Sequence, residues 1–278
     1  MSPRHLRKMS STIPPGPAKN TMCQNCSLRL LTLDRGPASP RSEWQRARHA
    51  ERKYLRQLLR IARHIGDLTE TGFNPADPAS AARLEVMLRR YADTITPWAE
   101  AAGWSMVSEV AARDERQWFR VSREMGRALR AEISSAPTGM AMRTALAEQV
   151  SLIRSLPIEA AQRVHDLTLK GITEGTRASE IAAEIMRSGK VSANRANLIA
   201  RTEVSRTASA LTQARAEHIG SPGYFWRTAG DTDVRPSHKA MAGQFVAWNA
   251  PPTLDGMTAH AGSFPNCRCY PEPVLPEI

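Results

Sequence analysis

Residues 192–228, SANRANLIARTEVSRTASALTQARAEHIGSPGYFWRT, decide the fold. Ser192 is a favoured helix-capping residue, and apolar side chains then recur every three or four positions, which predicts one long helix. Gly220 is typical of a helix end, and the aromatic run at 224–228 predicts a short strand. The apolar positions are Ala200, Val204, Ala208 and Leu211. We therefore expect the α+β class, with a mainly α-helical N-terminal body and a small β-containing C-terminal module.

Two more short strands are expected after residue 228. Residues 243–248 and 269–274 are rich in β-branched, aromatic and cysteine residues, and turn-forming residues separate them. Pro271 and Pro273 lack the N–H that a central strand donates, so they are expected to confine the last strand to a sheet edge.

Upstream of residue 192 the sequence predicts further helices. Trp44, Tyr54 and Leu58 belong to an apolar stripe over residues 42–65, with Gly66 as the expected stop. Another helix is expected to begin at residues 155–157, because proline is tolerated in a first helical turn. A shorter helix is expected to stop at Gly189.

These patterns divide the chain into three regions. Residues 1–40 contain six prolines and no apolar period, so a disordered basic arm is expected there. Residues 41–156 are expected to form an α-helical domain, and residues 157–278 the C-terminal module. No apolar run approaches the length of about 18 residues that a transmembrane helix needs, so no membrane-spanning segment is expected.

Positive charge is concentrated at the N-terminal end. Residues 1–72 contain 14 Lys and Arg against 5 Asp and Glu, whereas the rest of the chain is nearly balanced. Such an asymmetry favours contact with a polyanion, most simply double-stranded DNA bound without sequence preference. The alternatives are a solvated face or one that meets an acidic protein surface. The side chains predicted to meet phosphates are Arg52, Lys53, Arg56 and Arg60.

Polar residues with chemical potential crowd the last eighty positions. They are Arg201, Glu203, Asp231, Asp233, Arg235, His238, His260, Asn266, Cys267 and Cys269. In an extended segment the two cysteines share one face, so a mixed zinc site with His238 and His260 is one alternative. The spacing matches no standard zinc finger, and the Cys23–Cys26 pair has no second pair nearby. We favour a hydrogen-bonded structural motif, with no metal and no cofactor, that satisfies irregular backbone.

Five short motifs in this order also carry a family resemblance. They are Ala-Arg-Thr-Glu at 200–203, the strand containing Trp226, the turn from Asp231 to His238, Gly-x-Phe at 243–245 and Pro-Asn-Cys-Arg-Cys at 265–269. Over roughly residues 160–272 the chain resembles the phage Mu F-type head morphogenesis family, the minor head proteins of tailed phages. Two departures stand against a metal: Val234 and Ser237-His238 replace a second Cys or His pair, and Phe264 replaces a His.

The resemblance implies a virion component. It implies a minor capsid protein inside the head near the portal, present in the host cytoplasm during assembly, with the portal protein, capsid or scaffold proteins and DNA as partners. The sequence has no P-loop, Gly-x-Ser-x-Gly or His-Glu-x-x-His pattern, so we expect a protein that is not an enzyme. The alternatives are a metal-dependent nuclease or hydrolase using Asp231, His238 and His260, and a DNA-binding regulator.

Overall fold

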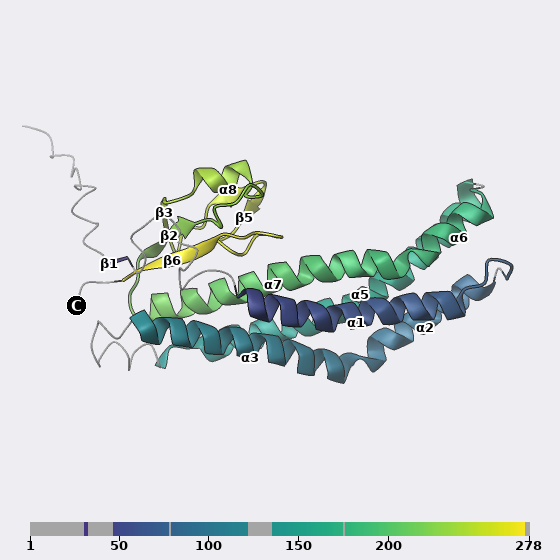
Figure 1. Cartoon of the computed structure of the whole chain (residues 1–278), viewed down its shortest axis with the longest axis horizontal. Coiled ribbons are helices and arrows are strands. Elements are labelled where there is room, and N and C mark those ends of the chain that lie inside the picture. Colours follow the sequence, from purple (N-terminus) through teal and green to yellow (C-terminus); the bar gives the residue numbers. More distant parts are fainter. Residues whose placement is uncertain (1–30, 33–46, 78, 122–134, 175, 276–278) are drawn as a thin grey trace, which may run out of the picture.

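The expected α+β class is confirmed by the computed structural model, which describes residues 31–32, 47–77, 79–121, 135–174 and 176–275. Helices form an elongated body, and a small antiparallel sheet lies on one end of it (Figure 1). The expected disordered arm, residues 1–40, lies outside the described residues except for the short strand β1 (Leu31–Thr32). None of the helices in the described ranges combines the length and apolar character that a bilayer crossing requires.

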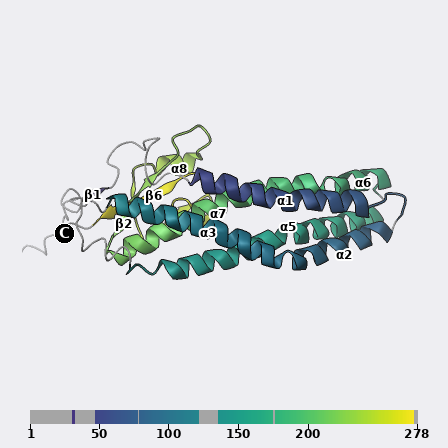
Figure 2. The same ribbon diagram turned by 60° about the horizontal axis from the view of Figure 1, so that its bottom comes forward.

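The body is a bundle of helices, most of them long, that lie side by side (Figure 2). They are α1 (Arg48–Gly72), α2 (Ala79–Thr94), α3 (Thr96–Val121), α5 (Thr138–Glu174), α6 (Ala178–Met186) and α7 (Ser188–His218). Their apolar stripes meet in one core that contains the fully buried side chains of Leu58, Leu84 and Ile153. Burial of these stripes, rather than helix propensity, holds such a bundle together.

The C-terminal sheet has the strand order β1-β6-β2-β3, with all neighbours antiparallel. Its strands are β2 (Gly223–Arg227), β3 (Phe245–Ala247) and β6 (Tyr270–Leu275), and a separate hairpin joins β4 (Thr253–Leu254) to β5 (Met257–Thr258). A second apolar core lies under this sheet and includes Tyr224, Trp226 and Phe264. Trp118 of α3 and Ala216 of α7 reach into the same core, so the sheet is packed on the helical body.

The expected edge position of the last strand is wrong, because β6 pairs with β2 on one side and with β1 on the other. The backbone N–H of Trp226 donates to the carbonyl oxygen of Gln244, and the backbone N–H of Gly243 donates to the carbonyl oxygen of Trp226. The backbone polar groups of Trp226 therefore face the β3 side, and those of its two neighbours in β2 face β6. Pro271 lies opposite Trp226, and Pro273 lies two residues further along, so neither has to donate to β2. The pairing with β1 begins only at Val274, beyond both prolines.

The expected helix start at residues 155–157 is also wrong. α5 runs without a break from Thr138 to Glu174 and carries Pro157 in its interior. The expected boundary between residues 156 and 157 therefore falls inside a continuous helix. Ile153 and Leu156 before the proline and Ala161 after it are all buried in the bundle core. Packing on both sides of Pro157 offsets the hydrogen bond that proline removes.

Two of the glycines expected to stop helices, Gly66 and Gly189, lie inside them. α1 continues through Gly66 to residue 72, and α7 already begins at Ser188, so neither Gly189 nor Ser192 marks a helix end. A β-carbon built on Gly189 would lie 2.8 Å from the Cα of Gly66, which places the two helix backbones in close approach. The lack of a side chain at Gly189 thus permits the crossing of α1 and α7. The packing of these two helices outweighs the low helix propensity of glycine.

The crossing predicts an asymmetric response to alanine. Gly189→Ala should lower the free energy of unfolding by about 1–3 kcal/mol, because its methyl group would overlap the backbone of α1. The matched control is Gly66→Ala, whose methyl group meets its nearest neighbour at 3.8 Å. This control should be neutral or stabilising by up to about 1 kcal/mol, since alanine is the better helix former. Urea denaturation measures both; equal effects would contradict the close approach.

Candidate functional site

The polar residues singled out in the sequence converge where the C-terminal half of the body meets the sheet. Three segments supply them: α7, the turn that leads into the short helix α8 (Pro236–Ala240), and the loop before β6. These segments are far apart in the sequence but in contact in the fold.

The loop before β6 is fixed to α7 by two hydrogen bonds that converge on Asn266. Arg201 donates from Nη1 to Oδ1 of Asn266 at 2.8 Å, and the backbone N–H of Asn266 donates to Oγ1 of Thr202 at 2.9 Å. Asn266 has a φ of 55°, a left-handed conformation that asparagine tolerates better than most residues. The asparagine therefore forms a sharp turn and attaches that turn to the helix.

Glu203 of the same motif points away from this loop attachment and into the body. Its carboxylate accepts a hydrogen bond from Nε2 of Gln149 at 3.2 Å and forms an ion pair with Arg206 at 3.1 Å. Gln149 in turn accepts from the Tyr54 hydroxyl at 2.8 Å. Burial raises the pKa of Glu203, and the positive charge of Arg206 opposes that shift. The residue thus links α7 to α5 and, through Gln149, to α1.

The turn after β2 docks on the same loop through charged side chains. Arg268 forms ion pairs with Asp231 at 2.6 Å and with Asp233 at 2.9 Å. Arg235 donates to the carbonyl oxygen of Pro265 at 2.8 Å and lies 3.8 Å from the carboxylate of Asp255. A forked arginine between two carboxylates fixes both position and orientation.

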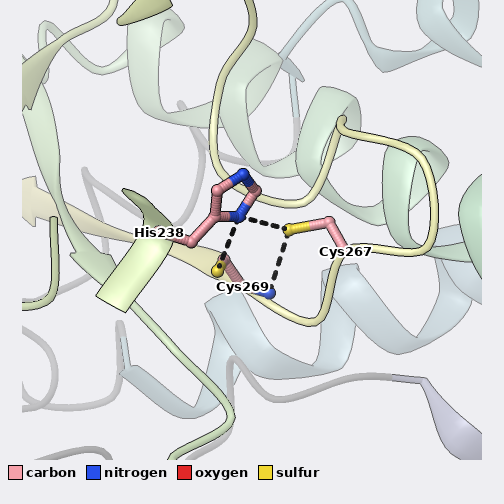
Figure 3. Close-up of side chains that lie close together, drawn as sticks. All are labelled: His238, Cys267 and Cys269. Atoms are coloured by element: carbon pink, nitrogen blue, oxygen red, sulfur yellow. Dashed lines mark hydrogen bonds between the residues drawn. The ribbon is translucent and has the colours of Figure 1, made fainter. Parts of the chain in front are cut away.

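This docking brings His238 against the two cysteines (Figure 3). Nδ1 of His238 lies 3.4 Å from Sγ of Cys267 and 3.5 Å from Sγ of Cys269. The backbone N–H of Cys269 also points at the Cys267 sulfur, at 3.3 Å. All three side chains are buried, and their ligand atoms lie within 4.8 Å of one another. We call His238, Cys267 and Cys269 the cysteine–histidine cluster.

Aromatic rings hold the imidazole of His238 in place. The Trp226 and Phe264 rings meet it edge-on, with centroids at 5.5 and 4.7 Å. Its second nitrogen, Nε2, is buried without a hydrogen-bond partner in the described part of the chain, and it lies 3.7 Å from Oδ2 of Asp255. The ring therefore has one nitrogen on the sulfurs and the other facing a carboxylate.

The two thiols have different acidities. The Cys269 thiol donates to the Cys267 sulfur, and backbone N–H groups of Cys269 and Gly262 add to that effect, so the pKa of Cys267 is lowered to about 5. The same side-chain contact, together with burial, raises the pKa of Cys269. Of the two thiols, Cys267 is therefore the one that ionises more readily.

His260, the fourth residue of the alternative zinc site, does not join the cluster. Its Nδ1 lies 3.2 Å from the hydroxyl of Tyr224, which also accepts from the backbone N–H of Ala261. Burial lowers the pKa of His260.

Sequence reasoning missed two residues that the site uses. Arg268 lies inside the quoted Pro-Asn-Cys-Arg-Cys motif, yet no role was assigned to it. Asp255 was passed over, although Asp255-Gly256 is a strong signal for a two-residue hairpin turn, and both residues have positive φ. The β4–β5 hairpin presents this carboxylate to His238.

The basic face predicted on the first helix is a separate feature. Arg52, Arg56 and Arg60 are exposed, whereas Lys53 is held by Glu109 at 2.8 Å. Beside them a groove of about 790 Å³ runs between α1 and the start of α7. Its charged lining consists of Lys53, Arg56, Arg60, Arg63, Lys190, Asp67 and Glu70. Arg52 lies outside the groove, and Arg63 and Lys190 extend the predicted set.

Comparisons with known proteins bear on the C-terminal part of the chain. Residues 162–271 match the family described as phage Mu protein F like protein, which confirms the resemblance stated from the motifs. An uncharacterized protein of Haemophilus influenzae is 36% identical over 129 residues, which cover 46% of this chain and 28% of that protein. The match thus spans less than a third of the relative's length. No solved structure matches.

The asparagine turn yields a prediction about stability. Asn266→Ala should lower the free energy of unfolding by about 1–3 kcal/mol for two reasons. It removes the hydrogen bond from Arg201, and alanine lacks the polar side chain that makes the left-handed conformation tolerable for asparagine. Asn266→Gly loses the same bond but adopts the turn freely, so it should be about 1 kcal/mol less destabilised. Thermal and urea unfolding of both variants test this; an Asn266→Ala protein as stable as the parent would refute it.

Proposed function

We propose that this chain, which carries a phage Mu protein F like module at residues 162–271, is a head morphogenesis protein of a tailed phage. The observation that carries the proposal is where the match falls. It runs from the second half of α5 to β6, and so contains α7, the turn to α8 and the loop before β6. The matched residues are thus the ones that meet in the candidate site.

The contacts of the site support a structural role. Arg268 is engaged by two aspartates, Arg201 holds Asn266, and Arg235 holds the carbonyl of Pro265. Each of these bonds joins one chain segment to another. We infer that the module is an assembly element and not an enzyme.

The alternative nuclease or hydrolase draws little support from the geometry. Asp231 is occupied by Arg268, and His260 is bonded to Tyr224, whereas His238 faces the two sulfurs. In the described ranges, the metal-ligating groups that cluster are His238 and the cysteines, without Asp231 or His260. A hydrolytic centre needs its metal ligands and its general base around one reacting atom.

We further propose that the protein acts inside the virion head next to the portal, after assembly in the host cytoplasm. The portal protein and capsid or scaffold proteins are its proposed partners. The elongated body offers long exposed helix faces for such contacts, and large apolar side chains such as Trp104 and Met140 are exposed on it.

This proposal predicts association with the virion. In particles produced by the phage that encodes the chain, the protein should co-sediment with DNA-filled heads and, when co-expressed, co-purify with the portal oligomer. Mass spectrometry of gradient-purified particles measures the first and size-exclusion chromatography the second. Absence from purified particles and from the portal complex alike would contradict the assignment.

Contact with double-stranded DNA is proposed for the groove between α1 and α7. The groove lining has five basic and two acidic side chains, and Arg56 and Arg60 have no ion-pair partner among the described residues. Basic side chains that bind phosphates release the counterions condensed on the DNA, and this release gives affinity without recognition of the bases.

The groove predicts a steep and removable salt dependence. Replacing its four freest basic residues with glutamine should reduce the slope of log affinity against log salt by roughly 3–4, at about 0.9 for each phosphate that the variant no longer neutralises. These residues are Arg56, Arg60, Arg63 and Lys190. Fluorescence anisotropy with random-sequence duplexes at several salt concentrations measures the slope.

A matched control separates the groove from net charge. It replaces four exposed basic residues outside the groove with glutamine, namely Arg90, Arg116, Arg143 and Lys239. This variant has the same net charge as the groove variant but should keep most of the parent slope. Equal slopes in the two variants would show that DNA is attracted by total charge, and no binding by the parent at low salt would refute DNA contact.

A further inference from the structure

We propose that the cysteine–histidine cluster binds one Zn²⁺ ion, through Nδ1 of His238 and the Sγ atoms of Cys267 and Cys269. The ion would join α8, which carries His238, to the loop before β6, which carries the two cysteines. This inference rests on the geometry of the cluster and is independent of the proposed phage function.

The distances within the cluster suit a tetrahedral metal. Zinc binds sulfur at about 2.3 Å and histidine nitrogen at about 2.0–2.1 Å, so neighbouring S and N ligands of a tetrahedron lie about 3.5 Å apart. Nδ1 of His238 lies 3.4 and 3.5 Å from the two sulfurs. Both nitrogen-to-sulfur distances thus already match those of a tetrahedral zinc site, and all three ligand atoms lie within 4.8 Å of one another.

The donor set favours zinc among the common metals. Two thiolates and one imidazole are soft and borderline ligands, which select zinc or cuprous copper over magnesium or calcium. Three protein ligands leave the fourth tetrahedral position to a water molecule or another external donor.

The surroundings of the cluster match what zinc ligands require. The backbone N–H of Cys269 points at the Cys267 sulfur at 3.3 Å, a contact that stabilises a negative thiolate. A metal on Nδ1 would place the ring proton on Nε2, the buried nitrogen that has no hydrogen-bond partner among the described residues and lies 3.7 Å from Oδ2 of Asp255. Carboxylates commonly take this position behind a zinc-bound histidine, where they orient the ring.

The fold gives the ion a structural task. The sheet module is small, and its strands β3, β4 and β5 have two or three residues each. Small modules with short strands often depend on a metal or a disulfide, because their cores bury little apolar surface. Zinc would join His238 to cysteines 29 and 31 residues later in the chain.

The decisive experiment measures metal in the full chain. The protein is purified without chelators and without a histidine tag, and metal is quantified by inductively coupled plasma mass spectrometry. We expect about one zinc per chain in the parent and near-complete loss in Cys267→Ser/Cys269→Ser. The matched control is Cys23→Ser/Cys26→Ser, which removes the other two cysteines and should keep the zinc. Asp255→Asn should retain the site with an affinity about 10–100-fold weaker.

Cobalt provides a readout that does not depend on folding of the variants. Chelator-treated parent protein titrated with Co²⁺ should develop thiolate-to-cobalt charge-transfer bands and the intense visible bands of tetrahedral cobalt, and Zn²⁺ should displace them. The Cys23→Ser/Cys26→Ser protein should show the same bands.

Several results would overturn the proposal. The first is parent protein that contains no zinc and gives no cobalt bands. The second is zinc that is lost in Cys23→Ser/Cys26→Ser but kept in Cys267→Ser/Cys269→Ser. Stoichiometric copper in place of zinc, or a Cys267–Cys269 disulfide detected by mass spectrometry, would also contradict it. The phage assignment would survive each of them, because it is tested by virion association.

Discussion

The attachment of one loop to one helix organises the C-terminal half of this protein. Asn266 turns the chain in a left-handed conformation, and Arg201 and Thr202 of α7 hold that turn by two hydrogen bonds. The turn sets the start of β6 and places the two cysteines that follow it. Arg235 then binds the carbonyl of Pro265, which brings α8 against the same loop. This attachment acts together with the bond from Ser209 of α7 to the Ala261 carbonyl oxygen at 2.7 Å and with the apolar core under the sheet, and these contacts position the cysteine–histidine cluster.

The rest of the molecule gives α7 a fixed position from which to act. α7 lies along α1, and the absence of a side chain at Gly189 lets the backbone of α7 approach the Cα atom of Gly66 closely. A buried ion pair between Arg215 and Asp114, 2.8 Å apart, ties α7 to α3 near the sheet. Burial raises the pKa of Asp114 to about 6, and Arg215 opposes that shift. One helix thus carries the core of the body on one face and the C-terminal module on another.

Much of the fold could be predicted from local pattern, and the failures share one physical cause. The α+β class, the helix that ends near Gly220 and the three strands follow from periodicity and aromatic content. Gly66, Pro157 and Pro271 were misjudged because each was interpreted by its local preference, whereas packing or strand register decides its setting. In the site, the sequence grouped His238 with the cysteines only in the alternative zinc site. Their contact, and the carboxylate that a hairpin turn places behind the ring, are determined by the tertiary fold.

The most direct test of this account is a double-mutant cycle on the loop attachment. The free energy of unfolding is measured for the parent, Arg201→Ala, Asn266→Ala and the double variant. The cycle removes the contribution of the altered turn conformation, which is common to both proteins that lack Asn266. We predict a coupling of about 1 kcal/mol or more, because the bond joins a charged donor to an amide oxygen. Additive effects, within about 0.3 kcal/mol, would contradict the claim that this bond holds the module on α7.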